Sequence, residues 1–247
     1  MTQPSYPNAP ITEAVIEIKF AKPLDSTDLD KANGKFTSDY PQHQNVQTFN
    51  VNLTLPNSQP VAPTAEFDRE VGHRHASVDM TELLLIWRSA FMLSQLAPYP
   101  GWDFFLNRFR RDWTTWKRVV GFREISRIGV RYINRIDIPV SGPIVEHEAF
   151  LNVYPKVPDI FGPLGAYAVQ AVVPIHDIGC KLTLNSAAVP SPILDHASFL
   201  FDQDIAKEAD PPQSDEAIYD LLNNIRVQKN KVFEACITNR ARELFKK

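Results

Sequence analysis

The residues of this chain best placed to do chemistry are three arginines in one alternating segment. Arg127, Arg131 and Arg135 lie at odd positions of the segment 125–138, so an extended strand places them on one face. The apolar residues that share the opposite face are Ile128, Val130, Tyr132, Ile136 and Ile138. Guanidinium groups bind phosphates and carboxylates through paired hydrogen bonds. The spacing therefore predicts a ladder of arginines on an open sheet face that binds phosphate or a carboxylate-rich partner.

An alternative use of the same arginines is internal charge pairing. Residues 11–20 alternate in the manner of a half-buried strand, and their polar face carries Glu13, Glu17 and Lys19. If the strands 11–20 and 125–138 are neighbours, the two carboxylates pair with the ladder, although exposed pairs contribute only ~0–1 kcal/mol each. Both hypotheses stay open at this point, and Glu13 and Glu17 join the three arginines as candidate binding residues.

Basic and aromatic residues gather in the segment 102–138. It holds nine Arg or Lys against four Asp or Glu, a net charge of +5 in a chain whose formal charge is −3. Arginines interleaved with aromatic rings are typical of single-strand nucleic-acid platforms. However, Trp102, Phe109, Trp113 and Trp116 lie on one apolar stripe of a predicted helix, where rings fill a core. Nucleic-acid binding is therefore the weakest of the functional alternatives, and the net charge gives no reason to expect a membrane partner.

The histidines and nucleophiles do not form a recognisable catalytic or metal-binding motif. His73 and His75 share one face of a predicted strand, but no Cys or His spacing of a zinc site accompanies them. Nucleophile-elbow, phosphate-loop and dinucleotide-binding glycine motifs are also missing from the sequence. Two acid–histidine pairs border predicted loops, His176–Asp177 and Asp195–His196. We therefore predict no metal and no cofactor, assign no catalytic residue, and leave open whether the protein is an enzyme.

Cysteine usage and hydropathy predict a cytoplasmic protein. Cys180 and Cys236 are expected to be buried thiols rather than a disulfide. The first residues lack the basic and apolar regions of a secretion signal. No apolar run approaches the ~20 residues that a membrane helix needs.

The pattern of hydrophobic residues predicts the same order of elements twice. The first series is a strand at 11–20, a helix at 25–40, strands at 46–55, 72–78, 83–87 and 90–96, and a strongly amphipathic helix at 102–120. The second is a strand at 125–138, a short helical stretch at 146–152, strands at 166–175, 180–187 and 197–205, and a closing helix at 214–245. That last helix of about 30 residues would extend roughly 45 Å.

This order predicts an α+β fold built on a large antiparallel sheet. Two similar strand–helix–meander–helix halves, 1–122 and 123–247, join into it, and the helices pack on one face. No linker rich in Gly and Ser separates the halves, so residues 1–247 are expected to form a single compact unit.

Several stretches of the chain resemble a sporadically distributed family of bacterial and archaeal proteins of similar length. The matching sequences are NAPITEAVIEIKF at 8–20, PYPGW at 98–102 and RIGVRYINRI at 127–136, together with 194–196 and 241–245. The resemblance brings no catalytic residue to carry over. The patchy distribution of the family implies a mobile accessory trait, such as phage defence or toxin neutralisation.

Three functions follow as hypotheses. The first is non-catalytic binding of a protein partner through the open sheet face or the arginine ladder, with self-association through the closing helix. The second is a pocket for a small ligand between the sheet and the closing helix, which would allow hydrolysis if the two acid–histidine loops lie at its mouth. The third is nucleic-acid binding.

Overall fold

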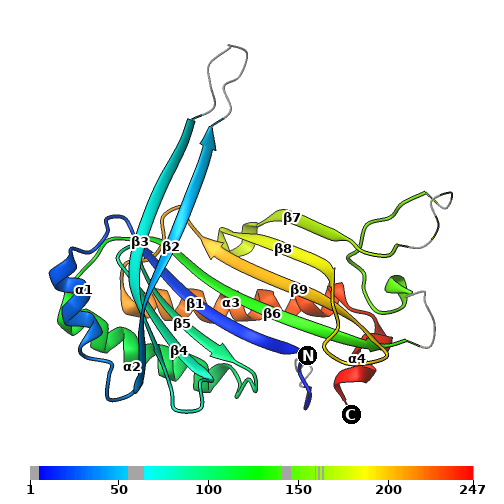
Figure 1. Ribbon diagram of the computed structural model, residues 1–247, viewed down its shortest axis with the longest axis horizontal. Helices are drawn as coiled ribbons and strands as arrows, with labels where there is room; N and C mark the ends of the chain where they lie inside the picture. The colour runs from blue at the N-terminus through cyan, green and yellow to red at the C-terminus, as the bar shows by residue number, and fades with distance from the viewer. Residues whose placement is uncertain are drawn as a thin grey trace.

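One antiparallel sheet organises the part of the chain that the computed structural model describes. These residues are 6–54, 64–140, 146–158, 160, 162 and 164–246, with the backbone alone over 49–54 and 64–68. Within them, nine strands form the sheet and helices pack against it (Figure 1). The predicted α+β class with an antiparallel sheet is confirmed.

The elements follow the chain in two series. The first comprises β1 (Ile11–Phe20), α1 (Ser26–Asn33), β2 (Gln42–Thr54), β3 (Thr64–Ala76), β4 (Glu82–Trp87), β5 (Ala90–Leu96) and α2 (Trp102–Val120). The second comprises β6 (Ile125–Pro139), the 3-10 turn η1 (His147–Ala149), β7 (Ala168–Ile175), the 3-10 turn η3 (His176–Ile178), β8 (Cys180–Val189), β9 (His196–Lys207), α3 (Asp215–Cys236) and α4 (Asn239–Phe245).

The first strands of the two series pair at the centre of the sheet. β1 and β6 run antiparallel, with Glu17 opposite Gly129 and Lys19 opposite Arg127. From β1 the sheet continues through β5, β4 and β3 to β2, and from β6 through β9 and β8 to β7. Because β1 and β6 are neighbours, the charged side chains of the two strands face the same space.

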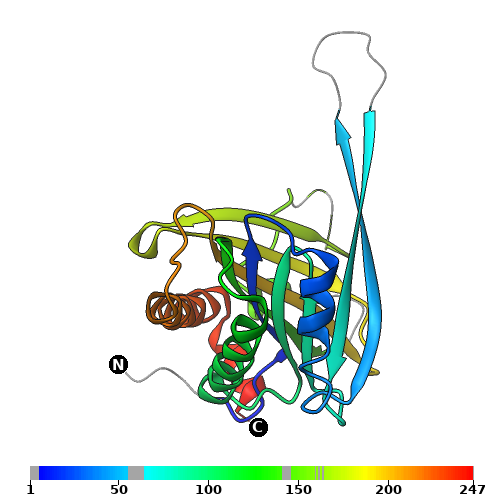
Figure 2. The ribbon, with the colours of Figure 1, turned by 90° about the vertical axis from the view of Figure 1, so that its left-hand side faces the viewer.

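The core lies on the helix-covered face of the sheet. Ile16 of β1 is fully buried and lies opposite Val130 of β6, which is also fully buried. α2 and α3 lie side by side on this face (Figure 2). From α2, Trp116 stacks on Phe20 of β1 with ring centroids 4.7 Å apart. Burial of such apolar surface, at roughly 25 cal/mol per Å², holds the helices on the sheet.

α2 begins and ends where the sequence pattern predicts. Its apolar stripe is buried, including Phe105, Phe109 and Trp113. Gly101 immediately precedes the helix with a φ of +106°, a conformation that residues with a Cβ rarely adopt. The turn before α2 therefore depends on a glycine, and it places Tyr99 against Tyr132 in the middle of β6.

The closing helix predicted at 214–245 is wrong in its length, because the chain breaks it into α3 and α4. Ile237 is extended and forms a β-bridge with Leu151. The side chain of Asn152 donates a hydrogen bond to the carbonyl of Ile237 at 3.3 Å, and Thr238 caps α4 by accepting from the Ala241 amide. α3 alone has 22 residues, which corresponds to about 33 Å.

Other boundaries differ in smaller ways. The helix predicted at 25–40 ends at Asn33, and the following turns bury Phe36 and Tyr40. β2 and β3 extend further than predicted and form a long hairpin that projects from the sheet (Figures 1 and 2). The stretch at 146–152 forms one 3-10 turn rather than a helix. Residues 55–63, between β2 and β3, lie outside the described residues. No helix in the described ranges is long and apolar enough to cross a membrane.

Candidate functional site

The first arginine of the predicted ladder is held by carboxylates from both neighbouring strands. Arg127 forms an ion pair with Glu17 of β1 and another with Asp204 of β9, at 2.6 Å. Gly129 lies opposite Glu17, and an added Cβ there would stand 2.4 Å from the Arg127 Nη1 atom. The absence of a side chain at Gly129 therefore gives the guanidinium room to cross the strand.

The other two arginines are also paired. Arg131 donates from Nε and Nη2 to the two carboxylate oxygens of Asp202 at 2.8 and 2.7 Å, a bidentate pair. Arg135 donates to Asp137 on its own strand at 3.0 Å, and Asp137 also accepts from Ser198 at 2.6 Å. Each arginine of the ladder thus has a carboxylate partner within the chain.

The two glutamates of the candidate set take different partners. Glu17 pairs with Arg127, whereas Glu13 accepts a hydrogen bond from Ser94 of β5 at 2.5 Å. Burial raises the pKa of Glu17, and the cations of Arg127 and Lys19 oppose that shift. The geometry favours internal pairing over an open ladder, with Asp202 and Asp204 of β9 as partners that the sequence analysis did not consider.

Two basic residues of α2 are likewise engaged inside the protein. Arg108 is buried and donates to the Ser94 carbonyl at 2.7 Å, and Lys117 pairs with Asp215. The four aromatic residues named for nucleic-acid stacking are buried: Trp102, Phe109, Trp113 and Trp116. Phe109, Trp113 and Trp116 pack against other core rings, so they are unavailable to stack on bases.

Three of the six histidines lie together. His43, His73 and His75 meet at the base of the β2–β3 hairpin, where His43 Nε2 lies 3.3 Å from His73 Nδ1. In the described ranges, no three His, Cys, Asp or Glu residues are arranged to hold a metal ion. His176 and Asp177 are exposed beside β7, outside the cavity described next.

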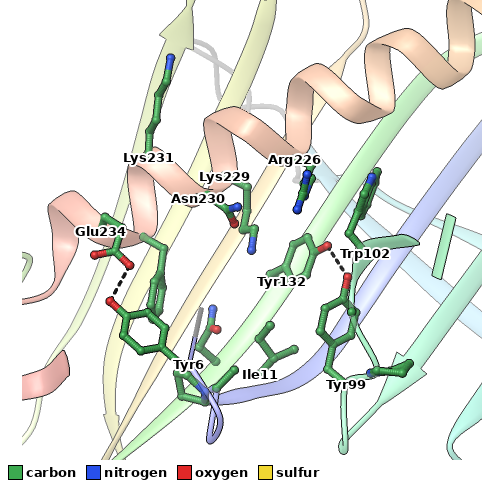
Figure 3. A pocket seen from close by; sticks show the side chains of 16 residues that line it. Tyr6, Ile11, Tyr99, Trp102, Tyr132, Arg226, Lys229, Asn230, Lys231 and Glu234 are labelled. Atoms are coloured by element: carbon green, nitrogen blue, oxygen red, sulfur yellow. Dashed lines mark hydrogen bonds between the residues drawn. The ribbon is translucent and has the colours of Figure 1, made fainter. Parts of the chain in front are cut away.

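A cavity of about 720 Å³ opens between α3, the start of β1, the middle of β6 and the turn before α2 (Figure 3). Aromatic rings form part of its walls, together with polar and charged side chains. The rings that line it are Tyr6, Tyr99, Trp102, Tyr132 and Phe233. The cavity lies between the sheet and the long C-terminal helix, where the small-ligand hypothesis places a pocket, but neither acid–histidine pair lines it.

Two tyrosine hydroxyls meet on the sheet side of the cavity. The Tyr99 and Tyr132 oxygens are 3.0 Å apart, so one proton lies between them and the other is available to an acceptor (Figure 3). Burial raises the pKa of Tyr99 to about 12 and that of Tyr132 well above its usual value, so both hydroxyls stay protonated at neutral pH. Asn134, buried beside them on β6, donates to the Phe201 carbonyl at 3.1 Å.

Two cations reach the cavity from α3. The Lys229 amine lies 4.0 Å from the centroid of the Tyr132 ring, a cation–π contact. Burial and the charge of Arg226 lower the pKa of Lys229 to about 8. Lys231 lies on the same helix, but its side chain points away from the cavity (Figure 3).

The acid that lines the cavity is already engaged. Glu234 accepts hydrogen bonds from Tyr6 and from Arg242, both at 2.8 Å. The Arg242 guanidinium also donates to the Glu234 carbonyl at 2.6 Å. Glu234 is thus neutralised at one end of the cavity, and the charge that remains near its centre is positive.

No family model and no curated protein matches this chain. The fold and the cavity therefore carry the functional argument.

The sequence analysis missed the residues of this cavity, although the pattern contains a signal. On α3, the buried positions Ile218, Leu222, Ile225 and Phe233 recur at helical spacing, and Lys229 occupies the place between the last two. A lysine on a core-facing stripe is rare unless it has a role, because burying its charge is unfavourable. Asn134 interrupts the apolar face of β6 in the same way.

Proposed function

We propose that the protein binds a small organic molecule in the cavity between α3, β6 and the turn before α2. The observation that carries this proposal is the volume of about 720 Å³ walled by aromatic rings and a few polar groups. Ligand sites are concave, mostly apolar spaces of roughly 300–1,000 Å³ with a small number of fixed polar groups. The arginine ladder has fewer hydrogen-bond donors left for a ligand, since its guanidinium groups are paired within the chain.

A variant whose cavity is filled by a larger side chain tests this proposal. Ala9 is exposed and lines the cavity, so Ala9→Trp fills space there with little risk to folding. Val78, 78% exposed at the β3–β4 turn, gives the matched control Val78→Trp. Native mass spectrometry of the purified protein, with a small-molecule library added, should show adducts for the wild type and the control but not for Ala9→Trp. Ligands that bind all three proteins equally would contradict the proposal.

Binding of a protein partner is the second candidate function. It is favoured by the arrangement of the sheet, because α2 and α3 cover one face and the β2–β3 hairpin extends beyond the other elements (Figure 2). Arg131, with a side chain 49% exposed, lies on the face away from the core. Arg131→Gln removes the charge without placing a second carboxylate beside Asp202.

Two experiments test this second function. Sedimentation velocity measures self-association, and co-purification with the product of a neighbouring gene detects a bound partner. Loss of an associated protein or of a self-associated state in Arg131→Gln, with unchanged thermal stability, would support it. A monomer that carries no partner in either form would remove this candidate.

We also propose that residues 1–122 and 123–247 are two versions of one structural plan. Support comes from the strand order, because each half starts with a central strand that is flanked by the last strand of its own meander. The cavity takes Tyr99 from the first half and Lys229 from the second, so joining the halves creates it.

A further inference from the structure

We infer that the ligand of this cavity is a small organic anion, a carboxylate or a phosphate or sulfonate ester on an apolar body, held by Arg226 and Lys229. This inference rests on the proposed binding function and specifies its chemistry. It comes from the balance of charge around the cavity.

The two cations point into the same space. Arg226 and Lys229 are three residues apart on α3, which places them on one side of the helix, and both side chains extend toward Tyr132 (Figure 3). Arg226 is close enough to lower the pKa of Lys229 and to act on both Tyr99 and Tyr132. Two like charges held side by side repel one another unless an anion lies between them.

Neither cation forms an ion pair within the described residues, and Glu234, the carboxylate that acts on Lys229 from a distance, is bound by Tyr6 and Arg242. The ion pairs of this region join Glu234 to Arg242 and leave Arg226 and Lys229 without one. The contact of Lys229 with the Tyr132 ring compensates only part of the cost of removing its charge from water. An incoming anion would supply the missing charge.

The remaining groups define the rest of the ligand. The Tyr99–Tyr132 pair retains one hydroxyl proton that an anionic oxygen accepts. Trp102 donates its indole N–H to Asn223 at 2.9 Å, so its ring forms a wall and its polar end is satisfied. The aromatic walls fit a flat or apolar body, and the two cations with the free hydroxyl fit its acidic group.

A pair of fluorescent probes that differ by one sulfonate tests the inference. The anion is 8-anilinonaphthalene-1-sulfonate, and the neutral analogue is N-phenyl-1-naphthylamine. We expect the anion to bind at least about tenfold more tightly than the neutral analogue, because a hydrogen bond to a charged group contributes ~1.5–3 kcal/mol. Lys229→Met and Arg226→Gln should each lower the affinity for the anion by about tenfold and leave the affinity for the neutral analogue unchanged.

Lys231→Met is the matched control. It removes a lysine from the same helix and the same rim, but one that is exposed and points away (Figure 3). Its affinity for both probes should equal that of the wild type. If Lys231→Met lowers the affinity for the anion as much as Lys229→Met does, the loss reflects the overall charge of the protein, and the inference is overturned.

The pH dependence gives a second readout. The titratable and charged groups that line the cavity around Lys229 are Tyr6, Tyr99, Tyr132, Arg226 and Glu234, and the exposed Lys231 lies at its rim with its side chain pointing away. The three tyrosines keep their protons because burial raises their pKa values, to about 12 for Tyr6 and Tyr99. Affinity for the sulfonate should therefore fall as the pH rises through about 8, as the Lys229 ammonium loses its proton, and this fall should be absent from Lys229→Met.

The outcomes separate the two proposals. If both probes bind with equal affinity, and Ala9→Trp abolishes both, the cavity binds ligands but the anionic class is wrong. If Ala9→Trp leaves the affinity for both probes unchanged, the binding function itself is contradicted. Absence of sulfonate binding to the wild type overturns the inference in either case.

Discussion

Three polar residues of this protein occupy positions where the sequence pattern calls for an apolar side chain. Lys229 on α3 and Asn134 on β6 both stand where the surrounding spacing calls for an apolar side chain, and both line the cavity. His75 is a third such position, since it lies on the core face of β3 opposite Leu84 and is fully buried. Each of these residues carries a desolvation cost, which its neighbours or a ligand must offset.

His75 should make the stability of the protein depend on pH. Neither of its ring nitrogens has a hydrogen-bond partner within the described residues, and burial lowers its pKa to about 4. Between pH 6.5 and 4 the unfolded chain binds more protons at this site than the folded one. The free energy of unfolding should therefore fall as the pH decreases through that window, by at most about 3 kcal/mol.

His75→Phe isolates this contribution. Chemical denaturation at several pH values should show a flatter profile for His75→Phe than for the wild type. The exposed residue His176 supplies the control His176→Ala, which should keep the wild-type profile. Parallel pH profiles for His75→Phe and the wild type would refute the assignment.

Asp112 should contribute strongly to stability as the centre of a buried polar network. It is 1% exposed, accepts from the Tyr40 hydroxyl at 2.5 Å and accepts from Arg111 Nε at 2.7 Å. We expect Asp112→Asn to lower the free energy of unfolding by about 1–3 kcal/mol, because the hydrogen bonds from Tyr40 and Arg111 lose a charged acceptor. Tyr40→Phe should cost about 1 kcal/mol, the contribution of a single hydrogen bond.

Urea denaturation of both single variants and of the double variant measures the coupling between these residues. Because the two groups are in direct contact, the double variant should lose less stability than the sum of the single losses. Additive losses would show that the hydroxyl and the carboxylate act independently.

At the scale of elements, local sequence determines where structures start, and tertiary contacts determine where several of them end. α2 follows its apolar stripe from the first residue to the last. The C-terminal helical segment has a continuous apolar pattern as well, yet it breaks at Ile237 because that residue bridges to Leu151 in a distant segment. The break orients α4 so that Phe245 is buried in the core.

The turn before α2 should require glycine at position 101 only for its backbone conformation, and not for space around the residue. Gly101 has a φ of +106°, and a Cβ added there would meet no atom within 4 Å, so the cost of Gly101→Ala is conformational. We expect a loss of about 1–3 kcal/mol in the free energy of unfolding, since this region of φ and ψ is nearly restricted to glycine.

Gly34 provides the comparison. It has a φ of −63° and an αR conformation, with its nearest contact to an added Cβ at 3.7 Å. Gly34→Ala should leave thermal stability unchanged or slightly raise it. Equal losses in the two alanine variants would contradict the account of the turn.

For the whole molecule, the central β1–β6 pair joins the two series of elements into one sheet. The cavity lies beside this junction, with Tyr99 contributed before it and Lys229 after it along the chain. We expect neither the fragment 1–122 nor the fragment 123–247 to unfold cooperatively alone, because each would expose a central strand edge and part of a shared core.

Co-expression of the two fragments tests this expectation. A stable complex on size-exclusion chromatography, with sulfonate-probe binding restored, is the expected outcome. Cooperative thermal unfolding of either fragment by itself, followed by circular dichroism, would show that the halves are independent domains.

The sequence by itself determined the class of the fold, the strands and the amphipathic helix α2. Periodicity is a local property: alternation in 11–20 and helical spacing in 102–120 depend only on neighbouring residues. The same pattern placed the three arginines on the face opposite Ile128 and Val130, and those apolar residues are fully buried.

Only the tertiary structure decided which charges meet. Arg131 pairs with Asp202, which is 71 positions away in the chain, and Arg226 and Lys229 face a cavity whose walls include Tyr99 of the first half. Ion pairs and cavities depend on distances in space, because the interaction of two charges falls with their separation and not with their spacing in sequence. A pattern of residues shows that a charge exists, but the fold decides whether that charge is already neutralised or remains for a ligand.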